Sequence, residues 1–288
     1  MNIWIKAASC AALTLLPAIA TAENDRNVLS IGGSVTEIIY ALGEGDRVIA
    51  RDTTSSYPAE VEALPDVGYM RALSPEGVLA VAPGLIISED GAGPPETIAV
   101  LEAADIPFVT VPDTYSTEGI VAKILAVGEA LDVEDAAATL ADDIRARLQM
   151  AEAAALARAG DAPKRVLFIL STQGGRIMAS GRNTAANGII QMAGGVNAIT
   201  EFEGYKPLSD EAVSAAAPDV ILMMDRSGDH NSDDAELFAM PAIATTPAAR
   251  TQSVVRMNGL YLLGFGPRTA DAVLDLTAAL YESRDDNI

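Results

Sequence analysis

Histidine and cysteine, which carry out much of enzyme chemistry, occur only once each in this chain. The only histidine, His230, lies in the acidic sequence DRSGDHNSDD, and the only cysteine is Cys10. Gly33-Ser34 lacks the second glycine of the G-x-S-x-G turn that exposes a serine nucleophile. A serine or cysteine hydrolase is therefore not expected, and we predict that the protein is not an enzyme.

Motifs for nucleotides and metals are equally weak. The segment GFGPRT at 264–269 lacks the third glycine of a dinucleotide fingerprint, and its Pro267 is better explained as the start of the final helix. No G-x-x-x-x-G-K sequence occurs. A zinc or manganese carrier usually presents several histidines with carboxylates, which one histidine does not supply.

The elements that would position a site follow a regular alternation. Short apolar runs rich in Val, Ile and Leu alternate with helix-length segments, which is typical of βα units on mostly parallel sheets. Residues 116–131 and Glu134–Arg158 are predicted to be helices, the first with a capping Ser-Thr-Glu start. The predicted strands are Asn27–Ile31, Arg47–Ala50, Leu85–Ser88, Phe108–Val111, Arg165–Leu170, Val220–Met224 and Ser253–Met257.

An internal repeat relates the two halves. SPEGVLAVAPGLI at 74–86 recurs as SDEAVSAAAPDVI at 209–221, with seven positions in register, and GYMRAL before the first copy is echoed by GYKPL before the second. We therefore predict two lobes of related topology. Ser34 with Glu37 fits a capping box, and SGRNT at 180–184 opens the matching helix. Both helix starts either direct free amides toward a ligand or are simple caps.

The predicted fold is α/β: two Rossmann-like lobes joined by a single long α-helix, with the ligand cleft between them. The expected boundaries are a signal peptide at 1–22, an N-terminal lobe at 23–115, a linking helix at 116–131 and a C-terminal lobe at 132–288. No Gly/Ser-rich linker separates the halves. We therefore expect only a small closing motion.

The N-terminus predicts export to the periplasm. MNIWIKAASCAALTLLPAIATA has one lysine, an apolar stretch and small residues before a cleavage point after Ala22. The alternatives are a membrane anchor, for which the apolar stretch is short, and a lipoprotein acylated at Cys10. Cleavage removes Lys6 and no acid, so the formal charge changes from -21 to -22. Such acidity opposes binding to nucleic acid.

Five segments together resemble the periplasmic hemin-binding proteins of bacterial haem ABC importers, within the helix-linked class of substrate-binding proteins. They are GGSVTEIIYALG, VGYMRALSPEGVLA, SGRNTAANGIIQMAGGVNA, GYKPLSDEAV and GLYLLGFGPRTADAV, and they are spread over nearly the whole mature chain, from residue 32 to residue 273. The resemblance implies haem as the transported ligand and an inner-membrane ABC importer permease as partner. It also points to an outer-membrane haem receptor system as the donor.

The resemblance further implies that Tyr69 is the axial ligand of ferric haem. A phenolate is a hard anionic donor suited to Fe(III), and tyrosine ligation of haem iron is known. Arg71 would lie on the same side of an extended segment and could donate a charge-assisted hydrogen bond to the phenolate. Without the resemblance, Tyr69 would be read as a half-buried surface tyrosine.

The second lobe should also contact a clamped ligand. Arg226 follows the expected strand VILMMD and could pair with a haem propionate or the Tyr69 oxygen, or equally with Asp225 or Asp229. Tyr205 occupies the echo of Tyr69 and either lines the cleft or ligates the iron. His230 is either a second ligand or a solvated loop residue.

Glu76 and Glu211 hold the same position in the two repeated segments. The resemblance implies that they dock onto arginines of the permease, and they also suit the first turn of a helix as acids favoured by its dipole. Two other functions stay open. One is a siderophore or corrinoid carrier of the same fold, although the only tryptophan, Trp4, lies in the signal. The other is an exported Rossmann-like enzyme or metallochaperone.

Overall fold

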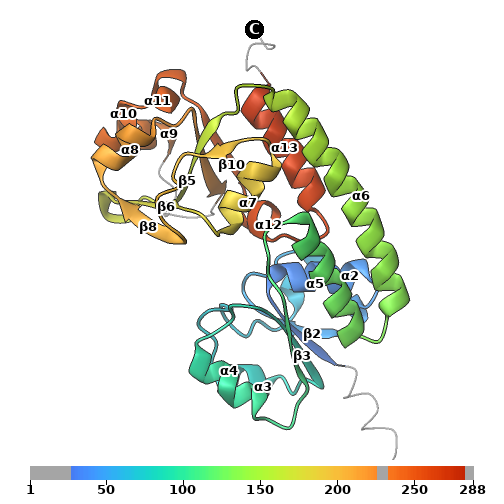
Figure 1. The fold of residues 1–288 in the computed structure, drawn as a ribbon. Coiled ribbons are helices and arrows are strands. Elements are labelled where there is room, and N and C mark those ends of the chain that lie inside the picture. The colour runs from blue at the N-terminus through green and yellow to red at the C-terminus, as the bar shows by residue number, and fades with distance from the viewer. Residues whose placement is uncertain (1–26, 226–232, 283–288) are drawn as a thin grey trace, which may run out of the picture.

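The computed structural model describes residues 27–225 and 233–282, which form two α/β lobes joined by a long helix (Figure 1). The strands are β1 (Val28–Ile31), β2 (Val48–Arg51), β3 (Leu85–Glu89), β4 (Phe108–Val111), β5 (Arg165–Ser171), β6 (Ile177–Ser180), β7 (Val196–Asn197), β8 (Tyr205–Leu208), β9 (Val220–Asp225) and β10 (Val254–Asn258). The helices are α2 (Gly33–Ala41), α3 (Pro75–Ala80), α4 (Pro95–Glu102), α5 (Thr117–Ala130), α6 (Glu134–Ala159), α7 (Ala185–Met192), α8 (Asp210–Ala216), α9 (Asp234–Ala239), α10 (Pro241–Ala244), α11 (Pro247–Thr251), α12 (Gly259–Leu263) and α13 (Thr269–Tyr281). The predicted signal peptide lies outside the described residues.

The N-terminal sheet has the strand order β2-β1-β3-β4, and all of its pairings are parallel. Its strands are apolar on both faces because helices cover both. Val28 and Ile87 face the core shared with α2 and α5, whereas Leu29 and Ile86 face a second core completed by α3 and α4. The predicted strands of this lobe are therefore confirmed to within one residue.

The C-terminal sheet has the order β10-β9-β5-β6-β8 over the described residues, with β7 paired to β5. Strands β10, β9 and β5 pair in parallel, and all three were predicted. Strand β6 pairs antiparallel with both β5 and β8, and neither β6 nor β8 was predicted. Strand β8 contains Lys206 and Pro207, both exposed, so it lacks an apolar run. Proline is tolerated there because β8 lies at the edge of the sheet.

The internal repeat is confirmed at the level of one helix and one strand. Helices α3 and α8 begin at equivalent serines: Ser74 accepts a hydrogen bond from the Gly77 amide, and Ser209 accepts one from the Ala212 amide. Each helix leads into a central strand, β3 or β9. The upstream echo is different, because Tyr69 lies in a loop whereas Tyr205 begins strand β8.

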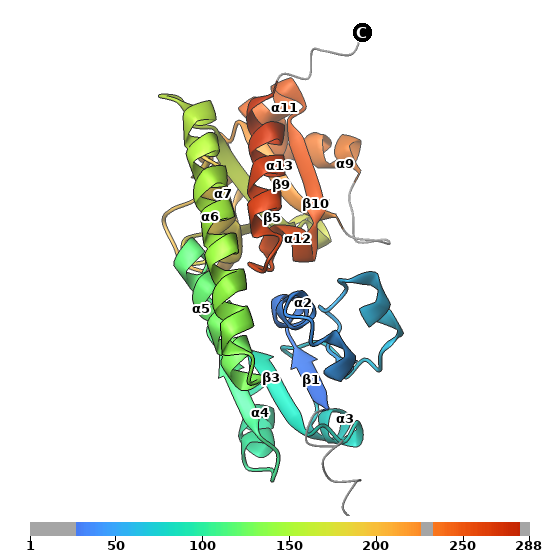
Figure 2. The ribbon, with the colours of Figure 1, turned by 90° about the vertical axis from the view of Figure 1, so that its right-hand side faces the viewer.

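The two lobes are linked by α6. The segment 116–131, which we expected to be the link, forms helix α5 and packs on α2 in the N-terminal lobe. Helix α6 is 26 residues long and contacts α5 of the N-terminal lobe and α7 and α13 of the C-terminal lobe. Figure 2 shows it running beside both lobes. Its inward face is mostly alanine, which permits this close packing along its length.

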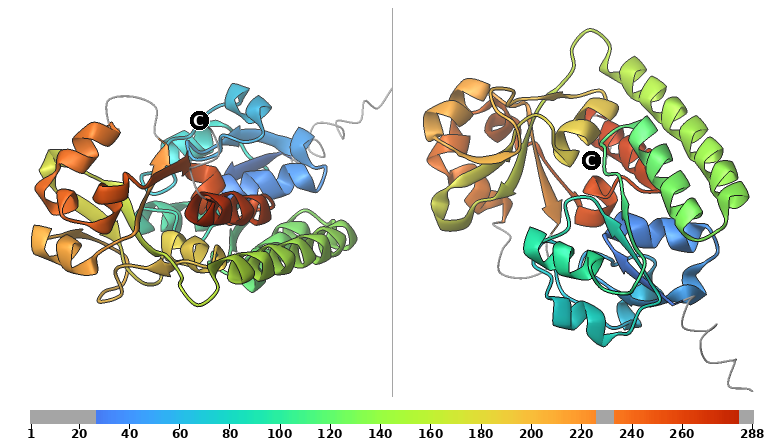
Figure 3. Two further views of the ribbon diagram at one scale, coloured as in Figure 1. Left: turned by 90° about the horizontal axis from the view of Figure 1, so that it is seen from above. Right: turned by 60° about the horizontal axis from the view of Figure 1, so that its bottom comes forward.

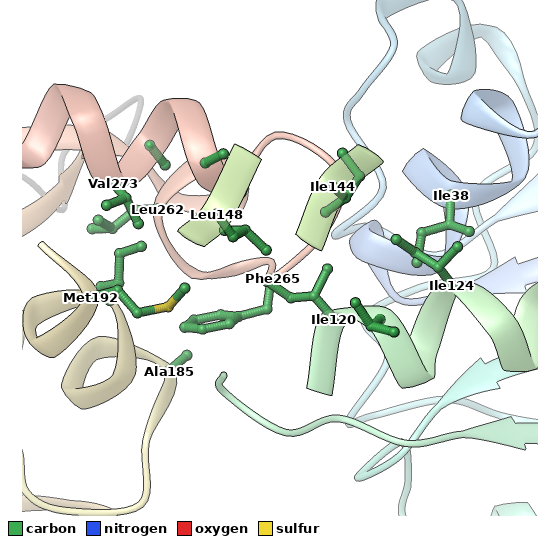
Figure 4. Packing of buried hydrophobic residues seen from close by; sticks show 14 of the residues in the cluster. Ile38, Ile120, Ile124, Ile144, Leu148, Ala185, Met192, Leu262, Phe265 and Val273 are labelled. Carbon is green, nitrogen blue, oxygen red and sulfur yellow. The ribbon is translucent and has the colours of Figure 1, made fainter. Parts of the chain in front are cut away.

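One hydrophobic core continues from lobe to lobe. Its buried members include Ile38 of α2, Ile124 of α5, Leu148 of α6 and Val273 of α13. In Figure 4, Phe265 lies between Ile120 on one side and Met192 on the other. The lobes are therefore packed against each other through apolar side chains as well as joined by a helix.

The carboxyl ends of the parallel strands in both sheets meet where the lobes touch (Figures 2 and 3). The start of α2, which follows β1, lies against α12, which follows β10: a Cβ on Gly33 would be 2.4 Å from a Leu260 methyl. Loops at these carboxyl edges are where open α/β sheets place their ligands. No helix in the described part of the chain is long and apolar enough to cross a membrane.

The close approach of α5 and α6 makes a first prediction. A Cβ on Gly128 would lie 2.1 Å from the Ala137 Cβ. Gly128→Ala should therefore lower the free energy of unfolding, because overpacking costs about 1–3 kcal/mol, although alanine is intrinsically the better helix former. Urea denaturation measures the change. The neighbouring exposed substitution Glu129→Ala is the control, and a Gly128→Ala protein of unchanged or higher stability would contradict this packing.

Candidate functional site

Tyr69 lies in a loop at the carboxyl edge of the N-terminal sheet. The loop is fixed to β2 because the Val67 amide donates to the Arg51 carbonyl at 2.9 Å and the Thr53 amide to that of Gly68 at 3.0 Å. Gly68 has a φ of +98°, a conformation that favours glycine. The Tyr69 side chain is 49% exposed, and none of the described residues hydrogen-bonds to its phenol. The phenol is thus presented to solvent by a well-anchored backbone.

Arg71 is not placed by an extended segment as predicted. The Ala72 amide donates to the Tyr69 carbonyl at 2.8 Å, so 69–72 is a turn. The turn forms because Met70 is buried in the lobe core and the Gly93 amide holds its carbonyl. Arg71 is exposed and lies within electrostatic reach of two phenols, those of Tyr115 and Tyr205.

Tyr205 comes from the opposite lobe and is half-buried. Its ring packs edge-on against Phe168 at 6.2 Å between centroids. Burial raises the pKa of the Tyr205 phenol, against smaller opposing effects from the Ala186 amide, the Thr184 side chain and the charge of Arg71. The structure therefore brings Arg71 and Tyr205 toward one another across the lobe boundary, with the Tyr205 phenol engaged at the start of α7.

Two of the candidate residues lie outside the described part of the chain. They are Arg226 and His230, both in 226–232. Within the described residues, no group of three or more histidine, cysteine, aspartate and glutamate side chains is arranged to hold a metal ion.

The predicted capping box at the start of α2 is wrong. The N-cap is Gly32, and no side chain caps the helix. Ser34 instead donates to the Glu89 carboxylate, and Glu37 accepts from the Arg268 guanidinium of the other lobe. Tertiary partners have drawn both side chains away from the helix end. The matching cap in the C-terminal lobe does form, since Thr184 accepts from the Asn187 amide at 3.0 Å.

A buried lysine organises the N-terminal edge. Lys123 is fully buried in α5 and donates to Asp113 Oδ1 at 2.7 Å, to Ser34 Oγ at 2.9 Å and to Glu89 Oε2 at 3.5 Å. Burial raises the pKa of Glu89, and the Lys123 charge opposes that shift. One cation thus holds two carboxylates directly behind the face that meets the other lobe.

Tyr115 and Lys123 were both missed by the sequence analysis. The pKa of the Tyr115 phenol is raised, mainly because the phenol is buried. The charge of Asp113 and its hydrogen bond with the phenol add to this rise. Its ring packs edge-on against Phe265 at 5.2 Å between centroids. A signal for Lys123 was available, because it lies three residues after Ile120 and four before Val127, on the apolar stripe of its helix. No comparable pattern marks Tyr115.

Glu76 and Glu211 are both exposed, in the first turns of α3 and α8. Hydrogen bonds from its own backbone amide and from Ser209 lower the pKa of Glu211. Both acids are therefore available to a partner, and they also suit the helix starts on which they lie.

Solved structures with this architecture share substantial sequence identity with the chain. The periplasmic heme-binding protein BhuT, in complex with two hemes, is 41% identical, with a TM-score of 0.85 over 89% of this chain and 98% of its own. The periplasmic heme-binding protein RhuT from Roseiflexus sp. RS-1, in apo form, is 39% identical, with a TM-score of 0.84 over 89% of this chain and 98% of its own.

A family model described as periplasmic binding protein matches residues 28–259. Among curated proteins, the vitamin B12-binding protein of Yersinia pseudotuberculosis is 27% identical over 81% of this chain and 81% of its own length. An uncharacterized ABC transporter substrate-binding lipoprotein of Bacillus subtilis, YvrC, is 29% identical over 70% of this chain, and the match spans 65% of that protein.

The buried lysine makes a second prediction. Lys123→Met should cost about 3–5 kcal/mol at neutral pH, because it leaves buried carboxylates without their cation. The pKa of Glu89 is raised in the folded state, so the folded protein takes up a proton at higher pH than the unfolded chain. The loss should therefore shrink as the pH falls toward the ordinary carboxyl range. Urea denaturation at several pH values measures it.

The control is Arg145→Ala, which removes an exposed ion pair with Asp142 and should change stability little at any pH. A Lys123→Met deficit that stayed constant or grew with acidification would contradict the assignment of Glu89 as the stranded group.

Proposed function

The chain belongs to the periplasmic binding protein family, and from that premise we propose that it carries ferric haem to an ABC importer of the inner membrane. The observation that carries the proposal is the 41% identity, over 98% of its length, to a periplasmic heme-binding protein solved with two hemes. The haem would lie between the lobes, at the carboxyl edges where loops from both sheets converge. It is cargo, and the protein acts as a carrier and not as an enzyme.

Tyr69 is the proposed axial ligand. Its ring is half exposed on an anchored loop, and none of the described residues competes for its oxygen. A free phenol titrates near 10, so bound Fe(III) must favour its ionised form. The guanidinium of Arg71, two residues away, adds a positive charge that stabilises a phenolate or a haem carboxylate.

The C-terminal lobe would supply the other wall. Tyr205 is proposed to line the site without binding iron, because its phenol is half-buried and already engaged near Thr184 and Ala186. Arg226 is proposed to pair with a haem propionate, as the loop after a central strand is the usual place for such a group.

The proposed cargo is consistent with a location in the periplasm, between a haem donor and the permease. We propose export through a signal peptide that is cleaved after Ala22, and residence in the periplasm. Haem would arrive from an outer-membrane receptor system. On release it would pass to the permease, which would dock on Glu76 and Glu211, the exposed acids at matching helix starts of the two lobes.

A corrinoid is the second candidate cargo. It is supported by 27% identity to a vitamin B12-binding protein over most of both chains. Haem is favoured because the two heme-binding structures are 41% and 39% identical and are covered almost completely. Parallel titrations with hemin and cobalamin distinguish the candidates, since a protein that bound cobalamin and left the hemin spectrum unchanged would reverse this preference.

The third prediction concerns the ligand oxygen. Tyr69→Phe removes only the phenol hydroxyl, so it should abolish the tyrosinate-ligated ferric spectrum and weaken hemin binding by roughly tenfold or more, equivalent to about 1.4 kcal/mol. Absorbance titration measures both effects. Tyr281→Phe is the matched control, because the Tyr281 hydroxyl donates to the Gly194 carbonyl within the C-terminal lobe. A Tyr69→Phe protein with the parent spectrum would remove Tyr69 from the site.

The fourth prediction concerns delivery. Glu76→Lys combined with Glu211→Lys should abolish hemin uptake by cells while leaving the hemin affinity of the purified protein unchanged. The matched control is Glu96→Lys with Glu236→Lys, which makes the same change of charge at exposed first-turn acids of α4 and α9. Uptake that survived the first pair, or was lost equally with the control pair, would count against docking at these two positions.

A further inference from the structure

Arg268 belongs to the C-terminal lobe, but its strongest partners belong to the N-terminal lobe. Its Nε donates to Glu37 Oε2 at 3.0 Å and its Nη2 to Glu37 Oε1 at 2.5 Å, which makes a two-pronged ion pair across the lobe boundary. The guanidinium also stacks on the Tyr57 ring, 3.6 Å from its centroid. Planar guanidinium groups are suited to this combination of forked hydrogen bonding and ring stacking.

The Glu37 carboxylate has few other hydrogen-bond donors near it. It is 5% exposed, and the Arg268 guanidinium is the one side chain among the described residues that donates a hydrogen bond to it. Burial raises the pKa of Glu37, and the hydrogen bond and charge of Arg268 oppose that rise more than the charge of Lys123 does. Removing the Arg268 guanidinium while the lobes stay packed would leave a buried carboxylate without its cation, which is strongly unfavourable.

The backbone around Arg268 is shaped to reach this partner. Phe265 is buried with a φ of +50°, in the left-handed region that bulky residues avoid. A Cβ on Gly266 would lie 3.4 Å from Glu37 Oε2 and 3.6 Å from Ser34. The loop thus packs directly on the start of α2, with the Phe265 ring against Tyr115.

We propose that Arg268 is a positioning residue: its ion pair with Glu37 and its stack on Tyr57 set the spacing and orientation of the two lobes before any ligand binds. The contact lies at the lobe boundary, which Arg71 and Tyr205 face from opposite sides. Fixing it fixes the distance at which the two halves of the site face each other. The consequence for haem rests on the proposed function, whereas the consequence for lobe geometry does not.

The fifth prediction is tested by measuring the lobe separation directly. The predicted mature chain has no cysteine, so nitroxide labels can be attached through Ala99→Cys on α4 and Ala215→Cys on α8, both exposed. Pulsed electron resonance without hemin should give one narrow distance distribution in the parent. Arg268→Ala should broaden or displace that distribution, and Arg268→Lys, which keeps the charge but not the fork, should do so less.

Two further proteins make the result decisive. Glu37→Gln with Arg268→Met removes both charges, so no carboxylate is stranded and folding is preserved, and the distribution should still broaden. Arg147→Ala is the control: it breaks an exposed ion pair between α6 and α13, in which Arg147 Nη2 donates to both Asp271 carboxylate oxygens at 2.8 and 2.9 Å, and it should leave the distances unchanged. A narrow, unshifted distribution in the double variant would overturn the proposal.

Hemin titration of the same proteins adds the functional readout. If the lobes of the Arg268 variants are in the binding arrangement about one-tenth of the time, hemin affinity should fall roughly tenfold while the spectrum of the bound form stays that of the parent. Unchanged affinity alongside altered distances would overturn the consequence for haem and leave the role of Arg268 in lobe geometry supported. A parent that bound no hemin would instead refute the proposed function and leave the distance test intact.

Discussion

The site depends on how the N-terminal and C-terminal lobes are held face to face. Tyr69 and Arg71 come from one lobe and Tyr205 from the other, so no single lobe contains the whole arrangement. The contact between the lobes has two chemically different parts. A wide apolar core runs through α5, α6 and Phe265, and the ion pair between Glu37 and Arg268 lies at the edge of this core. The apolar part supplies non-directional adhesion, and the ion pair supplies direction, because its forked geometry tolerates little rotation.

The connection through α6 limits motion in a second way. A helix of 26 residues is roughly 39 Å long at about 1.5 Å per residue, and it is packed along its length by α5 and then by α13. Bending such a helix sharply usually requires proline, paired glycine and serine, or a bulge, and α6 contains no proline, glycine or serine. We therefore expect opening to be a small adjustment at the lobe contact, which agrees with the expectation from the absence of a flexible linker in the sequence.

The features that were predicted from the sequence are those that depend on a short local pattern of side chains. Seven strands were found because buried parallel strands are continuous apolar runs, and the repeated Ser-x-Glu segments correctly indicated equivalent helix–strand units. Features set by distant partners were missed or misassigned. Ser34 and Glu37 have the spacing of a capping box, but Ser34 instead donates a hydrogen bond to Glu89, and Glu37 accepts one from Arg268. The edge strand β8 depends on pairing with β6, and the turn after Tyr69 depends on burial of Met70, neither of which a local pattern reveals.

The environments of Tyr69, Tyr115 and Tyr205 suit these three tyrosines to different chemistry. An iron ligand must be an ionised phenol, and burial raises the pKa of both Tyr115 and Tyr205, which favours their neutral forms. Both are also committed, Tyr115 to Asp113 and Phe265, and Tyr205 to the start of α7. Tyr69 is half exposed on a loop whose neighbour Met70 is fixed in the core, so its backbone is held while its oxygen can approach a ligand. A buried anchor beside an exposed donor is the arrangement that preorganisation requires, because the ordering of the loop is already complete before the ligand arrives.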